Sequence, residues 1–140
     1  MKSKNEMKYI YPKKVKIAAI VVAAALLLVV TELILYNFGP VMLHHEDIVT
    51  GENSTVFVSR EEAKEIKNMM NTKSFSSAFP TTCGYDINVA VTIGFRHYRV
   101  AMDGCSGLSL PIGTTFDLSD ENMDRLHSIF EKYDMHFPCI

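Results

Sequence analysis

The layout of this chain is set by one apolar segment, IAAIVVAAALLLVVTELILYNF, which runs from Ile17 to Phe38. The segment contains 22 residues, and none of those from Ile17 to Thr31 is charged. A helix needs about 20 apolar residues to cross a hydrocarbon core of about 30 Å. We therefore predict a single transmembrane helix at residues 17–38, whose anchoring residues include Ile17, Leu26, Leu27, Leu28, Tyr36 and Phe38.

Glu32 is the one charged residue in this segment. A charged carboxylate at the bilayer centre costs about 2.5–3.5 kcal/mol on insertion scales. Glu32, however, precedes Phe38 by six residues, which is about 9 Å of helix rise. We expect its side chain to reach toward water or to be protonated there. Tyr36 and Phe38 suit the membrane–water interface, where aromatic rings lie at headgroup depth, and Pro40 ends the helix.

Charge is distributed unevenly on the two sides of the apolar segment. Residues 1–16 carry six Lys and one Glu, for a net charge of +5, whereas residues 41–140 carry eight basic and fourteen acidic residues, for a net charge of −6. Basic residues that flank a membrane helix stay on the cytoplasmic side. The sequence therefore predicts a cell-membrane protein with a cytoplasmic N-terminus at residues 1–16 and a C-terminal domain outside. The residues that set this orientation include Lys8, Lys13, Lys14 and Lys16.

A cleaved signal peptide has the same basic and apolar regions as a membrane anchor. Its cleavage site needs small residues at the end of the apolar run, but Ala23, Ala24 and Ala25 lie in the middle of it. We therefore predict an uncleaved signal anchor. A buried helix of a soluble protein is less favoured, because a helix that is apolar on all faces needs a larger protein around it than the 100 residues 41–140 provide.

The rest of the chain is predicted to be a juxtamembrane spacer at residues 39–53, which show no hydrophobic period, and a small domain at residues 54–140. Ser59 and Glu62 form the pattern of a capping box, which begins a helix that ends near Asn71. Ser119 caps a second helix. The expected fold is α+β, with an antiparallel sheet of two to four strands, an edge strand near Pro111, and both helices of the domain on one face.

Alternating apolar and polar residues at 85–93 and 97–103 predict a β-hairpin. If Val91 pairs with Tyr98, the connection is Gly94–Phe95, a two-residue turn with glycine first, as a type II′ turn requires. In this register Cys83 and Cys105 emerge together at the open end of the hairpin. We predict a disulfide bond between them, which would stabilise the domain by about 3 kcal/mol in the oxidising environment outside the cell.

The third thiol, Cys139, leaves the count odd, so it is free, joins two chains, or replaces one member of the predicted pair. Zinc is an alternative use of Cys83, Cys105 and Cys139 together with one of His97, His127 or His136. No two of these cysteines have the close spacing of a zinc site, so we expect no metal and no other cofactor. His127 borders the apolar stripe of the last helix, where a half-buried histidine paired with a carboxylate is the favoured interpretation.

No motif for catalysis is present: the chain contains no G-x-S-x-G, no H-E-x-x-H and no phosphate-binding glycine loop. We therefore assign no catalytic residue and favour a non-enzymatic protein. The first function class is a disulfide-stabilised binding or accessory module at the membrane surface, with the lipid bilayer and another membrane or exported protein as partners. The acidity of residues 41–140 argues against nucleic acid. The alternative is an extracytoplasmic activity that depends on thiols or a metal.

Overall fold

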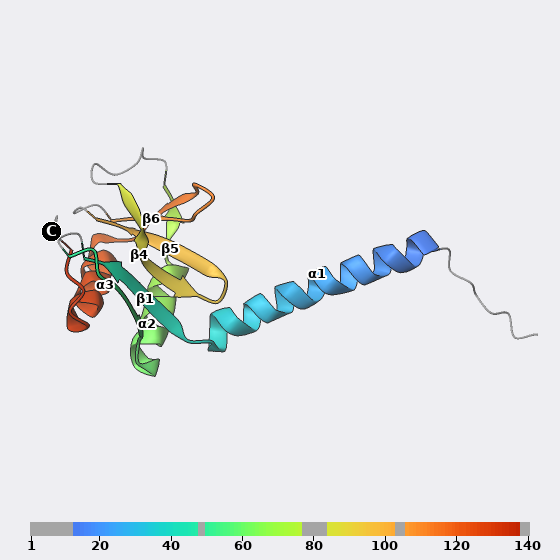
Figure 1. Ribbon diagram of the computed structural model, residues 1–140, viewed down its shortest axis with the longest axis horizontal. Coiled ribbons are helices and arrows are strands. Elements are labelled where there is room, and N and C mark those ends of the chain that lie inside the picture. Colours follow the sequence, from blue (N-terminus) through green and yellow to red (C-terminus); the bar gives the residue numbers. More distant parts are fainter. Residues whose placement is uncertain (1–12, 48–49, 77–83, 103–105, 138–140) are drawn as a thin grey trace, which may run out of the picture.

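The computed structural model describes residues 13–47, 50–76, 84–102 and 106–137. In these ranges the chain forms a long N-terminal helix followed by an α+β domain (Figure 1). The helices are α1 (Lys13–Phe38), α2 (Arg60–Asn71) and α3 (Asp120–Lys132). The strands are β1 (Val41–Glu46), β2 (Asn53–Phe57), β3 (Ser74–Phe75), β4 (Tyr85–Ile93), β5 (Arg96–Ala101), β6 (Gly107–Ser109) and β7 (Thr115–Asp117).

Within the described residues the sheet is antiparallel and has seven strands, in the order β2-β1-β4-β5-β6-β7-β3. The α+β class is confirmed, but the expected two to four strands are too few. β3 has two residues and β7 has three, which is too short to show a period-2 pattern in the sequence. The strand near Pro111 is also not at an edge, because Leu108 pairs with Val100 on one side and with Phe116 on the other.

The segment predicted as a spacer contains a central strand of this sheet. β1 pairs with β2 on one side and with β4 on the other. Its inward residues Val41 and Leu43 are completely buried, and the third, His45, is buried with its Nε2 donating to the backbone oxygen of His136 at 2.7 Å. The prediction of a spacer is therefore wrong for this part. A histidine at an inward position concealed the alternation, and only residues 39 and 40 separate α1 from the sheet.

Both helices of the domain begin where the sequence predicts. Ser59 caps α2 in a reciprocal capping box with Glu62, and the Ser119 side chain accepts a hydrogen bond from the amide of Asn122 at the start of α3. The buried faces of the two helices pack with alternate residues of the strands in one hydrophobic core. Its largest fully buried members include Leu43, Ile66, Met70, Ile93, Tyr98, Leu126 and Phe130.

The β4–β5 hairpin follows the predicted register at its closed end. Val91 pairs with Tyr98 and Ile93 with Arg96, so the turn is Gly94–Phe95, and Gly94 has the positive φ of 58° that this turn demands. Toward the open end the register shifts between Tyr85 and Ala90, so that Tyr85 lies opposite Ala101. The register from which the Cys83–Cys105 bond was predicted therefore does not extend along the whole hairpin.

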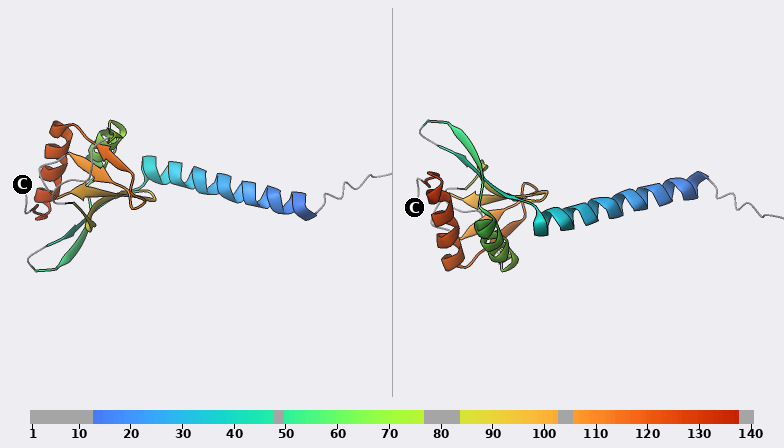
Figure 2. Two further views of the ribbon diagram at one scale, coloured as in Figure 1. Left: turned by 90° about the horizontal axis from the view of Figure 1, so that it is seen from above. Right: turned by 90° about the horizontal axis from the view of Figure 1, so that it is seen from below.

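α1 projects from the domain as a 26-residue helix (Figures 1 and 2). Its large apolar side chains are exposed along its length: Leu27 is 68% exposed and Ile20 also 68%. In the described residues, its polar contacts with the domain come from the last two turns, through Glu32, Tyr36 and Asn37. α3 lies at the end of the domain opposite α1, as both views in Figure 2 show.

Candidate functional site

The cysteines that the sequence singles out, Cys83, Cys105 and Cys139, lie outside the described residues. The predicted disulfide and the thiol-based alternatives therefore stay predictions. Within the part of the chain that the structure describes, no group of three or more His, Cys, Asp and Glu side chains is placed to hold a metal ion.

His127, one of the histidines considered as a metal ligand, is part of the packed interior. Its side chain is 7% exposed and its ring centroid lies 4.4 Å from that of Phe137. Burial lowers the pKa of His127 below its ordinary value, although the nearby charges of Asp124 and Glu131 act in the opposite direction. Its Nε2 is buried without a hydrogen-bond partner among the described residues. We conclude that His127 is a neutral packing residue, more deeply buried than the half-buried position that the sequence suggested.

α1 is the one helix in the described ranges that is long and apolar enough to cross a membrane. Its most apolar window of 18 residues is 0% buried. The anchoring residues predicted from the sequence, from Ile17 to Phe38, all lie in this helix. Of these, Tyr36 alone packs against the core of the domain.

The C-terminal turns of α1 are joined to the β4–β5 turn through Glu32. One carboxylate oxygen of Glu32 accepts a hydrogen bond from the backbone amide of Phe95 at 2.8 Å, and the other forms an ion pair with Arg96 Nε at 2.9 Å. The guanidinium group of Arg96 also lies over the ring of Tyr36, 4.8 Å from its centroid. A side chain at position 94 would collide with Glu32, since a Cβ there would come within 2.7 Å of its oxygen. Glycine at this position therefore serves both the turn and the close approach of the helix.

A second set of contacts joins the end of α1 to α2. The Lys67 ammonium group donates to the backbone oxygens of Asn37 and Gly39, at 3.1 and 2.6 Å. These carbonyls have no partner within the helix, so a cation there both satisfies them and stabilises the helix dipole. Tyr36 donates its hydroxyl proton to Asn71 at 3.0 Å. Together, the contacts of Glu32, Tyr36 and Lys67 form a junction that holds α1 against the domain from two sides.

A groove of about 770 Å³ lies at this junction. Three cationic residues line it, Arg60, Lys64 and Lys67, together with the chain from Tyr36 to Pro40, and no carboxylate is among its lining residues. Burial lowers the pKa of Lys67. The domain therefore presents positive charge around the end of its apolar helix, although its overall charge is negative.

The face of the sheet opposite the helices carries a polar cluster around Thr92. The Thr92 hydroxyl lies 2.9 Å from His44 Nε2 and 2.9 Å from His97 Nδ1, and the other ring nitrogen of His44 lies 3.0 Å from the Thr55 hydroxyl. Burial and the neighbouring His97 lower the pKa of His44, so its ring is neutral at pH 7. His44, Thr55 and His97 border a small pocket of about 220 Å³. The cluster can therefore exchange hydrogen bonds with a polar partner.

The sequence did not reveal the junction, although it contained one signal. Glu32 was recognised as an unfavourable charge in an apolar helix, and such a charge calls for a partner. Arg96 is 64 residues away in the chain, so the pairing depends on the three-dimensional fold.

Replacing Glu32 with Ala is expected to speed hydrogen exchange at the Phe95 amide by about tenfold, because a hydrogen bond to a charged acceptor contributes about 1.5–3 kcal/mol. The measurement is residue-resolved amide exchange on the full chain in detergent micelles. Amides in the middle of β4, such as that of Val91, serve as the control and should keep their rates. Unchanged exchange at Phe95 would contradict the junction.

No family model, curated protein or solved structure matches this chain.

Proposed function

We propose that this protein is a single-pass membrane protein in which α1 spans the bilayer and holds a non-enzymatic binding or accessory domain at its outer surface. The observation that carries this proposal is the exposure of α1: its apolar window is 0% buried. An exposed apolar surface of this length requires an apolar environment, which a bilayer provides.

The junction at the end of α1 supports the same function. A domain on a flexible spacer could lie at any distance from the membrane, whereas here two residues and a set of polar contacts connect helix and sheet. The pairing of Glu32 with Arg96 also reduces the cost of a carboxylate near the end of the membrane helix, because an ion that is paired is less costly to bury. We infer that the domain is carried close to the bilayer surface.

The uncovered face of the sheet is our candidate surface for the partner. The two helices cover the other face, so the hydroxyl and imidazole groups around Thr92 remain accessible to another membrane or exported protein. The lysine-rich N-terminus, including Lys8, Lys13, Lys14 and Lys16, favours an orientation in which this domain lies outside the cell membrane. That compartment would permit the proposed Cys83–Cys105 bond.

The test of the anchor is Leu27→Arg. An arginine at this depth of a membrane helix costs about 2.5–3.5 kcal/mol. We therefore expect the equilibrium constant for insertion of α1 to fall by about a hundredfold. The measurement is the fraction of full-length protein that stays with membranes after alkaline extraction. Glu131→Arg, on an exposed position of α3, is the matched control and should remain with the membranes.

Two outcomes would overturn the proposal. Wild-type protein that is released by alkaline extraction would show that α1 does not span the bilayer. A reporter fused to the C-terminus that is active only in the cytoplasm would reject the outward orientation while leaving the anchor intact.

A further inference from the structure

We propose that the side of the domain nearest α1 is a second membrane contact, in which Phe95 at the tip of the β4–β5 turn enters the lipid headgroup region. This inference rests on the proposed function, since it requires α1 to span the bilayer. The partner of this contact is the surface of the lipid leaflet that faces the domain, at the point where α1 leaves the bilayer.

The first argument is the depth of the β4–β5 turn. The turn is bonded to Glu32, through the amide of Phe95 and the side chain of Arg96. Glu32 lies about 9 Å below the end of the helix at Phe38. The uncharged run below it, from Lys16 to Glu32, spans only about 24 Å of helix, whereas the hydrocarbon core is about 30 Å thick. The bilayer must therefore reach the level of Glu32, and the turn bonded to it lies at the boundary between acyl chains and headgroups.

The second argument is the composition of the surface around this turn. The large hydrophobic residues that are exposed in the described part of the domain are Phe57, Phe75, Phe95 and Ile112, which are 62–84% exposed. Phe75 and Arg96 line one groove of about 420 Å³ beside the turn, together with Leu110. Ile112 follows Leu110 in the β6–β7 connection, which points to the same side of the domain as α1 (Figure 1).

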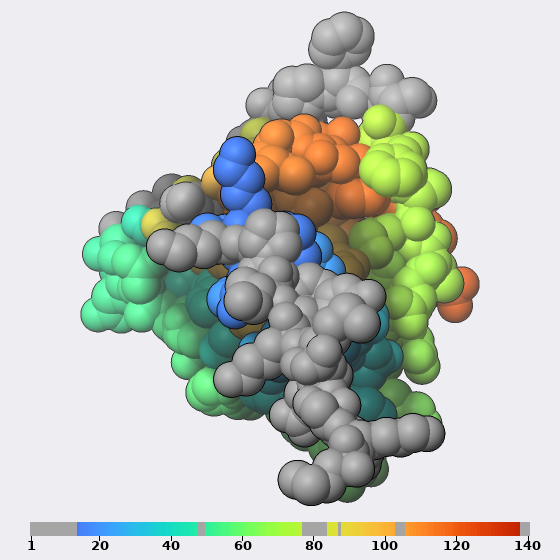
Figure 3. All heavy atoms as spheres, turned by 90° about the vertical axis from the view of Figure 1, so that its right-hand side faces the viewer, coloured from blue at the N-terminus to red at the C-terminus, as the bar shows by residue number. Residues whose placement is uncertain are grey.

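Figure 3 shows this side of the molecule along α1, with the β6–β7 region (orange) next to the segment around β3 (yellow-green). Phe75 lies in the edge strand β3, Phe95 in the β4–β5 turn and Ile112 in the β6–β7 connection, so three separate segments supply these exposed apolar residues. We call these three residues the apolar rim. Exposed aromatic and aliphatic residues grouped in this way are typical of surfaces that enter a membrane interface.

The third argument is the charge beside the apolar rim. Lys73 and Arg96 line the same groove as Phe75; Arg96 is also paired with Glu32 of α1, and none of the described residues that line the groove is a carboxylate. On the other side of α1, Arg60, Lys64 and Lys67 line the junction groove, again without a carboxylate. Residues 41–140 have a net charge of −6, so two grooves whose charged lining residues are all cationic contrast with the rest of this domain. Apolar side chains flanked by Lys and Arg suit a membrane surface, because the apolar groups can contact the acyl chains while the cations contact the lipid phosphates above them.

A protein partner at the same surface is less favoured by the geometry. It would have to enter between the domain and the bilayer, beside α1, at the level where the turn is bonded to Glu32. The lipid already occupies that space when α1 spans the membrane.

The experiment uses the absence of tryptophan from the whole sequence. Phe95→Trp places the sole tryptophan of the full chain at the tip of the turn, a position that is 62% exposed and outside the core. The variant is reconstituted into vesicles of phosphatidylcholine and phosphatidylglycerol, with or without bromine atoms on the upper part of the acyl chains. We expect brominated lipid to reduce the tryptophan emission by about half or more, because an indole at the interface contacts these chains.

The matched control is Glu131→Trp, which carries the sole tryptophan on an exposed position of α3, at the far end of the domain (Figure 2). Its emission should be insensitive to brominated lipid and sensitive to iodide in the water. Ile112→Trp, on the apolar rim and 84% exposed, repeats the test at a second position in case tryptophan disturbs the turn.

The outcomes separate this inference from the proposed function. If the protein floats with the vesicles but both rim tryptophans respond only to iodide, the anchor stands and the second membrane contact is rejected. If both are shielded from iodide and also unaffected by brominated lipid, a protein surface covers the apolar rim and the inference is overturned. If the protein does not float with the vesicles, the proposed function fails and the inference fails with it.

Discussion

Replacing Leu43 with Ala is expected to lower the free energy of unfolding by about 3 kcal/mol, because truncating a fully buried leucine removes apolar contacts and leaves a cavity. Leu43 is 0% exposed, and it lies in β1 between Val56 of β2 and Val91 of β4. The measurement is urea-induced unfolding of the full chain in a mild detergent, followed by the near-ultraviolet circular dichroism of its tyrosines.

The matched control for Leu43→Ala is Met42→Ala, one residue earlier in the same strand. Met42 points to the opposite face of the sheet and is only partly buried, so its truncation should cost much less. Equal and small losses for the two variants would mean that β1 does not contribute to the core. That result would restore the interpretation of residues 39–53 as a spacer.

The elements that the sequence predicted are those whose determinants are local. A capping box joins two residues three positions apart, and Ser59 with Glu62 located the start of α2 correctly. The turn at Gly94–Phe95 was predicted because a single register places the apolar residues of both strands on one face. Helix periodicity over 12 or 13 residues is also long enough to be read reliably.

The elements that the sequence did not reveal depend on distant partners. β1 is a strand because β2 and β4 lie on its two sides, and β3 and β7 are so short that only their pairing with each other and with β6 defines them. The register shift between Tyr85 and Ala90 is of the same kind. No pattern of the residues at 85–90 distinguishes a continuous ladder from an interrupted one.

The candidate site likewise contains features that the sequence predicted and contacts that it did not reveal. Length and composition predicted the long apolar helix α1, and the lysines before it gave the expected orientation, which stays a prediction. The junction could not be derived, because Glu32 meets Arg96, and Asn37 meets Lys67, only after the domain has folded. His127 was correctly placed beside an apolar stripe, but the aromatic ring of Phe137 that encloses it comes from beyond the last helix.

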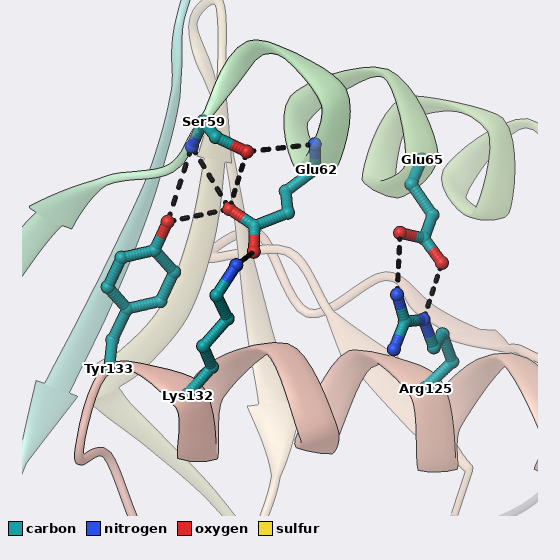
Figure 4. A network of polar contacts seen from close by, with 6 residues as sticks. All are labelled: Ser59, Glu62, Glu65, Arg125, Lys132 and Tyr133. Atoms are coloured by element: carbon teal, nitrogen blue, oxygen red, sulfur yellow. Dashed lines mark hydrogen bonds and ion pairs between the residues drawn. The ribbon is translucent and has the colours of Figure 1, made fainter.

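The contact between α2 and α3 depends on the carboxylate of Glu62, which is 7% exposed (Figure 4). Lys132 and Tyr133 donate to its two oxygens, each at 2.6 Å, and the hydroxyl of Ser59 donates to it at 2.7 Å. The hydrogen bond from Lys132, followed by those from Tyr133 and Ser59, lowers the pKa of Glu62 to about 2, against the opposing effect of burial. The ionised form is therefore the one that the folded protein stabilises.

Replacing Glu62 with Gln is expected to lower the free energy of unfolding at pH 7 by about 2 kcal/mol. A pKa shift from 4.5 to about 2 corresponds to a larger loss of folding free energy than this. The Lys132 side chain is 65% exposed, however, so solvent screens part of its interaction with Glu62. Because the pKa is lower in the folded state than in the unfolded state, this stabilisation is present above pH 4.5 and is lost as the pH falls toward about 2.

The difference in stability between wild type and Glu62→Gln should therefore be constant from pH 7 to pH 5 and should shrink toward zero between pH 4.5 and about 2. The measurement is urea-induced unfolding at pH 7, 5, 3 and 2. Glu65→Gln is the matched control on the same helix: Glu65 pairs with Arg125 at 2.5 Å, but the two side chains are 36% and 54% exposed. Solvent screening makes such a pair a minor contributor, so Glu65→Gln should leave the stability and its pH dependence nearly unchanged. An equal loss in the two variants, or a Glu62→Gln difference that persists to pH 2, would show that the buried carboxylate does not link α2 to α3.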